Sequence, residues 1–131
     1  MQRGMLVVAS VTGFLGVAAG AFGAHGLEGR VSVERLAAWK TGAEYQLVHA
    51  VVLLVLAGLP LYEPRWQRLA SFAFITGVLV FSGSLYVLVL SGRGMWGAVT
   101  PIGGVLLLLG WALLGVAGVQ ALRKGTDRGS H

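Results

Sequence analysis

The chain has no cysteine, which excludes disulfides, thiolate nucleophiles, iron–sulfur clusters and covalently attached haem. Charge is also scarce: Asp, Glu, Lys and Arg make up only 11% of the residues, against about 25% in an average soluble domain. Hydrophobic residues account for 56% of the 131 positions, and a soluble core of this size cannot bury that much apolar surface. We therefore predict a single domain whose main partner is the lipid bilayer.

The net charge of +5 comes from basic residues that form no continuous patch. These residues flank the apolar runs, which is typical of a topology signal in a membrane protein. A nucleic-acid-binding surface needs a basic stripe or an aromatic stacking motif, and the sequence has neither. We predict no nucleic-acid partner.

Four apolar runs have the length of membrane-spanning helices, at 4–24, 45–62, 69–91 and 100–122. The first run could instead be a signal peptide, because Arg3 gives a basic start and Ala19-Gly20-Ala21 a cleavage pattern. The run is longer than the usual apolar region of such a peptide, roughly 7 to 15 residues, and this favours a helix. We predict an all-α integral membrane protein with four transmembrane helices in an up-down bundle.

The bundle is expected to occupy residues 1–125 as a single domain. Residues 126–131 are expected to form a polar C-terminal tail. The sequence from Arg128 to His131, Arg-Gly-Ser-His, resembles the start of an expression tag, so His131 is left out of any site.

The charged segment before the second run also has a helical pattern. Ser32 is a suitable N-cap, Glu34 suits the first turn, and apolar residues recur at Val33, Leu36, Trp39 and Ala43. We predict a short amphipathic interfacial helix anchored by Trp39, which continues straight or bends at Gly42 into the second span. For the later spans, Pro64 suits the start of the third helix, and Thr100-Pro101 resembles an N-cap followed by proline in the fourth.

Small residues recur at helical spacing and predict close helix packing. They are Gly13, Gly16, Gly20 and Gly23 in the first span and Gly77 in the third. In lipid there is little hydrophobic drive between helices, so association depends on close backbone approach, which glycine permits. We favour packing within one chain, with a homo-oligomer seam as the alternative.

Four crossings place most polar residues of the spans at one membrane face. The ends of the helices that share this face carry His25, Glu44, Tyr45, Gln46, His49, Ser82, Ser84, Tyr86, Arg93 and Thr100. Six basic residues lie at the opposite face against four at this one, which favours both termini in the cytoplasm.

Among these residues His49 is the most informative, because it lies about one turn inside an apolar span. Either the neutral imidazole is hydrogen-bonded to a neighbouring helix and fixes packing, or it belongs to a site for a proton, a metal or a polar ligand. A metal site would require His25 and His49 to converge, with or without Glu44 as a third ligand. Two histidines without a tight spacing motif are a weak signal, and we predict neither a cofactor nor catalytic residues.

Five motifs, in order, resemble a known family. They are Gly20-Ala-Phe-Gly-Ala-His-Gly-Leu27, Tyr45-Gln-Leu-Val-His49, Phe81-Ser-Gly-Ser-Leu-Tyr86, Thr100-Pro-Ile-Gly-Gly104 and Gly110-Trp111. Over residues 5–122 the chain is similar to the small bacterial membrane proteins of the domain of unknown function 423 family, which is itself similar to the transmembrane protein 256 group. The resemblance implies a protein of the bacterial inner membrane with no assigned function, and it supplies no catalytic residues.

Residues and resemblance together predict a multi-pass protein of the inner or plasma membrane that is more consistent with binding than with catalysis. We predict a non-enzymatic scaffold or ligand-binding protein whose polar pocket holds His25, Tyr45, Gln46, His49, Ser82, Ser84 and Tyr86. The alternatives are an oligomeric transporter or channel component and a metal-dependent membrane enzyme.

Overall fold

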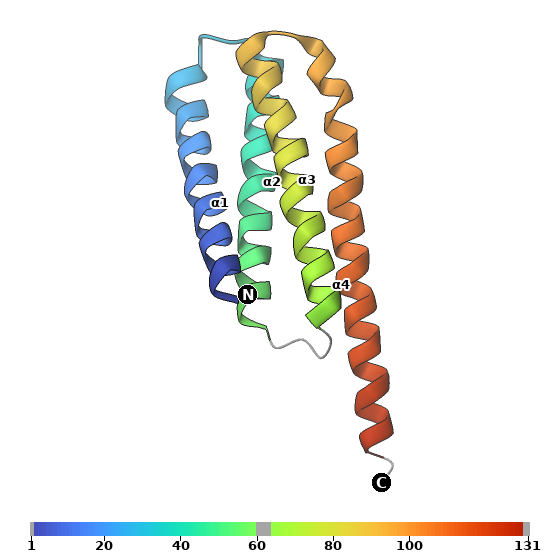
Figure 1. The fold of residues 1–131 in the computed structure, drawn as a ribbon. Coiled ribbons are helices and arrows are strands. Elements are labelled where there is room, and N and C mark those ends of the chain that lie inside the picture. The colour runs from blue at the N-terminus through green and yellow to red at the C-terminus, as the bar shows by residue number, and fades with distance from the viewer. Residues whose placement is uncertain (1, 60–63, 130–131) are drawn as a thin grey trace.

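The computed structural model describes residues 2–59 and 64–129, and the described part of the chain is helical and without strands. The elements in chain order are α1 (Gln2–Phe22), the π-helix η1 (Gly23–Leu27), α2 (Val33–Gly58), α3 (Pro64–Ser91), the 3-10 helix η2 (Gly94–Ala98) and α4 (Thr100–Arg128). The four α-helices run alternately up and down (Figure 1), and all four are long and apolar enough to cross a membrane. The predicted up-down architecture is confirmed.

The four helices stand side by side in chain order, so the bundle is open (Figure 1). The helix α2 packs against α1 and α3, while α4 packs against α3. In the part of the chain that the structure describes, no Cα atoms of α1 and α3 lie within 8 Å of each other, and the same holds for α2 and α4. Any contact across these two gaps must therefore come from side chains.

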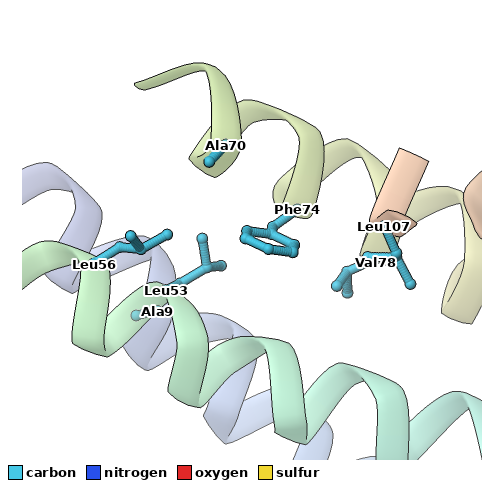
Figure 2. Close-up of a cluster of buried hydrophobic side chains, with 7 residues drawn as sticks. All are labelled: Ala9, Leu53, Leu56, Ala70, Phe74, Val78 and Leu107. Carbon is cyan, nitrogen blue, oxygen red and sulfur yellow. The ribbon is translucent and has the colours of Figure 1, made fainter. Parts of the chain in front are cut away.

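Two buried apolar clusters hold the helices together. The larger cluster contains Ala9, Leu53, Leu56, Ala70, Phe74, Val78 and Leu107 and draws on all four α-helices. Figure 2 shows Phe74 of α3 pointing toward Leu53 of α2, and the Phe74 side chain is fully buried. The smaller cluster, Leu27, Trp39 and Val89, lies nearer the end at which η1 leads into α2.

Glycine residues set the closest helix contacts. A Cβ atom on Gly16 would lie 2.9 Å from a methyl of Leu47, and one on Gly23 would lie 2.6 Å from the Trp39 ring. Gly13 faces Ala50 at 3.7 Å, so these three glycines pack α1 or η1 against α2. Gly77 makes the equivalent contact with Leu107 of α4, whereas a Cβ atom on Gly20 would meet no atom of another element within 4 Å.

The structure does not separate an interfacial helix from the second span. A single helix, α2, begins after Ser32, whose side chain accepts a hydrogen bond from the Arg35 backbone N–H at 3.2 Å. Trp39 is only 5% exposed and donates from its indole N–H to the Ala19 carbonyl at 2.7 Å. The indole occupies the space that Gly23 leaves open, so Trp39 is a packing residue and not an anchor in the headgroup region.

Helix α4 differs from the prediction at both ends. Thr100 is not the N-cap, because helix α4 is preceded by Val99 and the Thr100 hydroxyl instead lies 2.6 Å from that of Ser84 on α3. At the other end the helix continues to Arg128, through the first half of the segment predicted as a tail. Helix α3 begins at Pro64, the residue predicted to suit its start, and residues 60–63 lie outside the described residues.

The contact between Gly103 and Phe81 provides a test of this packing. A Cβ atom added to Gly103 would overlap the Phe81 backbone, because it would lie only 2.6 Å from the Phe81 Cα atom. A Cβ atom added to Gly104 would lie 3.9 Å from the Phe81 ring. We expect Gly103→Ala to lower the free energy of unfolding by about 1–3 kcal/mol, because backbone cannot move aside as a flexible side chain can. Unfolding in detergent, followed by circular dichroism, measures this change.

Gly104→Ala is the matched control, since it adds the same methyl group and the same helix propensity one residue further on. We expect its free energy of unfolding to equal or exceed that of the parent protein. Equal stability of the two variants would contradict the close α3–α4 approach at Gly103.

Candidate functional site

A chain of hydrogen bonds joins three helices near the middle of the bundle. The Tyr86 hydroxyl of α3 donates to the Gln46 side-chain oxygen of α2 at 2.7 Å. The Gln46 side-chain nitrogen donates in turn to the Thr12 carbonyl of α1 at 3.0 Å. Gln46 is 7% exposed, so its amide is buried and polar, and such a group is stable in this position only when it is hydrogen-bonded.

The residues around this chain explain the position of the Tyr86 ring. A Cβ atom on Gly42 would lie 3.0 Å from the ring, so glycine lets the ring lie against α2. The centroid of the Tyr86 ring is also 4.5 Å from that of the Trp39 ring. Ser82, one turn earlier on α3, donates its hydroxyl to the Gly42 carbonyl at 2.7 Å and is buried.

A groove runs along α2 between α1 and α3, and we call it the α1/α3 groove. It has a volume of about 750 Å³. One wall comes from α1 between Val7 and Phe22, the other from α3 between Ile75 and Tyr86, and the floor comes from α2 at Trp39, Gln46 and Leu53. The groove exists because both walls pack against α2 and not against each other. Its walls are apolar, and Gln46, Ser82 and Tyr86 contribute polar atoms.

His49 faces the other side of the bundle. Its Nδ1 atom lies 2.7 Å from the Tyr45 carbonyl, and its Nε2 atom lies 3.3 Å from the indole nitrogen of Trp111 on α4. A carbonyl can only accept and an indole N–H can only donate. The geometry therefore fits a neutral imidazole with the proton on Nδ1, and both ring nitrogens are paired.

The residues predicted to form one pocket are thus divided among several environments. Gln46, Ser82 and Tyr86 line the α1/α3 groove, and Ser84 is paired with Thr100 at the α3–α4 contact. Tyr45 is 43% exposed, with its ring 4.5 Å from that of Phe81. His25 is exposed in η1, and within the described chain it forms no hydrogen bond or ring contact with His49.

Two important residues had no role in the sequence-based pocket. Trp39 lines the groove although its sequence pattern indicated an interfacial anchor. Trp111 pairs with His49, and only its place in the Gly110-Trp111 motif pointed to it. Within the residues that the structure describes, no group of three His, Cys, Asp or Glu side chains is placed to hold a metal ion.

The contact between His49 and Trp111 should be detectable as an energetic coupling. We expect a double-mutant cycle of His49→Phe and Trp111→Phe to give a coupling free energy of about 0.5–1.5 kcal/mol, the value of one hydrogen bond between side chains. Unfolding free energies in detergent supply the four corners of the cycle.

Trp96→Phe combined with His49→Phe is the control, because Trp96 lies in η2 and makes no recorded contact with His49. These two changes should be additive. Ring ¹⁵N shifts should also show His49 protonated on Nδ1, and a proton on Nε2 would contradict the proposed geometry.

Comparison with known proteins places the chain in a family. The family described as "Protein of unknown function (DUF423)" matches residues 19–104. The UPF0382 inner membrane protein YgdD of Escherichia coli is 42% identical over 127 residues, which cover 96% of this chain and 97% of YgdD. The UPF0382 membrane protein YwdK of Bacillus subtilis is 38% identical over 119 residues, which cover 89% of this chain and 97% of YwdK. No solved structure matches the chain. The four spans and these relatives make the chain an inner-membrane protein that belongs to the DUF423 family.

Proposed function

We propose that this protein is a non-enzymatic binding protein that holds a hydrocarbon-chain ligand in the α1/α3 groove. The observation that carries the proposal is the combination of long apolar walls with a few convergent polar groups, Gln46, Ser82 and Tyr86, in one cavity of about 750 Å³. Ligand sites in proteins have this character and a volume of roughly 300–1,000 Å³. The apolar walls suit a hydrocarbon chain and offer an ion or a sugar no partner.

The dimensions of the groove suit an extended hydrocarbon chain. Along α1 the lining extends from Val7 to Phe22, and 15 steps of 1.5 Å give a length of about 22 Å.

The groove is also long relative to one leaflet of the bilayer. A leaflet contributes about 15 Å of the hydrocarbon core, and the groove follows α1 for about 22 Å. A ligand that fills the groove therefore reaches past the middle of the membrane. This favours a long or deeply placed chain over the tail of a lipid that remains in its own leaflet.

Gly83 allows the groove to be filled without disturbing the fold. It lines the groove, and a Cβ atom there would meet no atom within 4 Å. We expect Gly83→Leu to reduce labelling of the groove residues by a photoreactive long-chain alcohol about tenfold, because the new side chain occupies the space of the ligand. Mass spectrometry of the labelled peptides, with Leu79 and Val11 as reporters, measures the change.

Gly115→Leu is the matched control, because Gly115 also has no neighbour within 4 Å but lies on α4 and does not line the groove. It should leave the labelling of Leu79 and Val11 unchanged. Labelling of Leu108, which is 70% exposed on α4, reports general contact with lipid. The proposal fails if Gly83→Leu changes groove labelling no more than it changes labelling at Leu108.

We also propose that both termini face the cytoplasm. Arg3, Arg65, Arg68, Arg123 and Lys124 belong to the face of the termini, and four basic residues belong to the other. An alkaline phosphatase fusion after residue 128 should be inactive in a bacterial host, and one placed between η1 and α2 should be active. Equal activity of the two fusions would contradict this orientation.

A further inference from the structure

The lining of the α1/α3 groove limits the charge of the ligand. None of the described residues that line it is Asp, Glu, Lys, Arg or His. A phosphate or carboxylate inside the groove would be a charge without a counter-ion in the hydrocarbon region, which is strongly unfavourable. The part of the ligand that enters the groove must therefore be uncharged.

The floor of the groove nevertheless offers a hydrogen bond to a ligand. The Gln46 amide has two N–H protons, and one of them goes to the Thr12 carbonyl. The second has no partner among the described residues, although Gln46 is only 7% exposed and lines the groove. Because a buried donor gains most from an acceptor in a medium without water, the group that best complements Gln46 is a neutral carbonyl.

The charge-free lining disfavours a phospholipid as the source of this carbonyl. The ester carbonyls of a phospholipid lie beside a charged headgroup, and none of the described lining residues could pair with that charge. A neutral lipid therefore complements the groove better than a phospholipid does.

Aromatic side chains at the same end of the groove indicate the shape of the head. Phe22, Trp39 and Tyr86 all line it. The Trp39 ring centroid lies 5.5 Å from that of Phe22 and 4.5 Å from that of Tyr86. Aromatic side chains bind flat rings by offset-stacked or edge-to-face contact. A flat ring beside Trp39 and Tyr86 would lie next to the Gln46 amide, because the Tyr86 hydroxyl is bonded to Gln46.

We infer that the ligand of the α1/α3 groove is a neutral lipid with a flat, carbonyl-bearing ring as its head and a hydrocarbon tail, the chemistry of an isoprenoid quinone. The inference rests on the proposed function, since it names the head of the ligand whose tail occupies the groove. One ring carbonyl accepts the second N–H of Gln46, and the ring lies against Trp39 and Tyr86. The tail follows the apolar walls toward Val7 and Ile75. The protein binds this molecule and performs no chemistry on it.

Two ligands that differ only in the carbonyl groups test the inference. Decyl-1,4-benzoquinone and decylbenzene have the same ring size and the same tail, so a groove that recognises only hydrocarbon will bind them equally. We expect the quinone to bind about tenfold more tightly, because only the quinone can accept the Gln46 hydrogen bond. Native mass spectrometry of the intact protein released from detergent micelles gives the two Kd values.

The double variant Gln46→Met, Tyr86→Phe removes the amide donor and the hydroxyl bonded to it, so that no polar atom of the pair is left without its partner. We expect the ratio of the two Kd values to fall to about 1 in this variant, because residue 46 can then donate no hydrogen bond to either ligand. The matched control is Ser84→Ala, Thr100→Val, which removes a hydroxyl pair outside the groove. It should preserve the ratio of the parent protein.

The outcomes separate the two proposals. Equal Kd values for the two ligands in the parent protein would overturn the carbonyl-bearing head and leave binding of a hydrocarbon chain intact. A quinone preference that persists in the Gln46→Met, Tyr86→Phe variant would also overturn it, because Gln46 would then not be the donor. Failure of both ligands to bind, together with no effect of Gly83→Leu on groove labelling, would overturn the proposed function itself.

Discussion

The structure depends on the hydrogen bonds that connect Thr12, Gln46 and Tyr86 across α1, α2 and α3. In lipid, no water can replace a broken polar contact, and there is little hydrophobic drive to bring helices together. The Gln46 side chain therefore fixes the positions of both neighbouring helices relative to α2. These hydrogen bonds explain why α1 and α3, the two walls of the groove, keep a defined separation. In the described chain no Cα atom of α1 lies within 8 Å of a Cα atom of α3.

His49 has the corresponding role on an adjacent face of α2, toward α4. It lies three residues after Gln46, about 60° around the helix, and this rotation directs it toward α4. The bond from Trp111 bridges α2 and α4, whose backbones, like those of α1 and α3, do not come close in the described residues. One turn of α2 thus holds two polar contacts that connect it to helices on two sides, and the close glycine contacts at Gly16 and Gly77 complete the α1–α2 and α3–α4 pairs.

The sequence was sufficient to predict the four spans, because long apolar runs in a chain with 11% charged residues have only one stable arrangement in lipid. The sequence could not predict that Gln46 and His49 contact different neighbouring helices. Both are polar residues of the same helical turn, and which neighbour each meets is decided by the order of the helices, which periodicity does not encode. Trp39 was misassigned for a related reason: an aromatic residue near a span end usually lies in the headgroup region, but here Gly23 on η1 leaves room for the indole. Thr100 likewise meets Ser84 instead of capping its own helix.

Selectivity in such a groove must come from its few polar atoms. Every lipid in the bilayer offers methylene groups, so the walls between Val7 and Phe22 gain little when one hydrocarbon chain replaces another. A ligand that satisfies the second N–H of Gln46 gains a hydrogen bond that a plain lipid tail cannot make. Discrimination by a missing or added polar contact is stronger than discrimination by one methylene group. Under the proposed function, the same amide that holds the walls apart is therefore also the group that determines which molecule the groove retains.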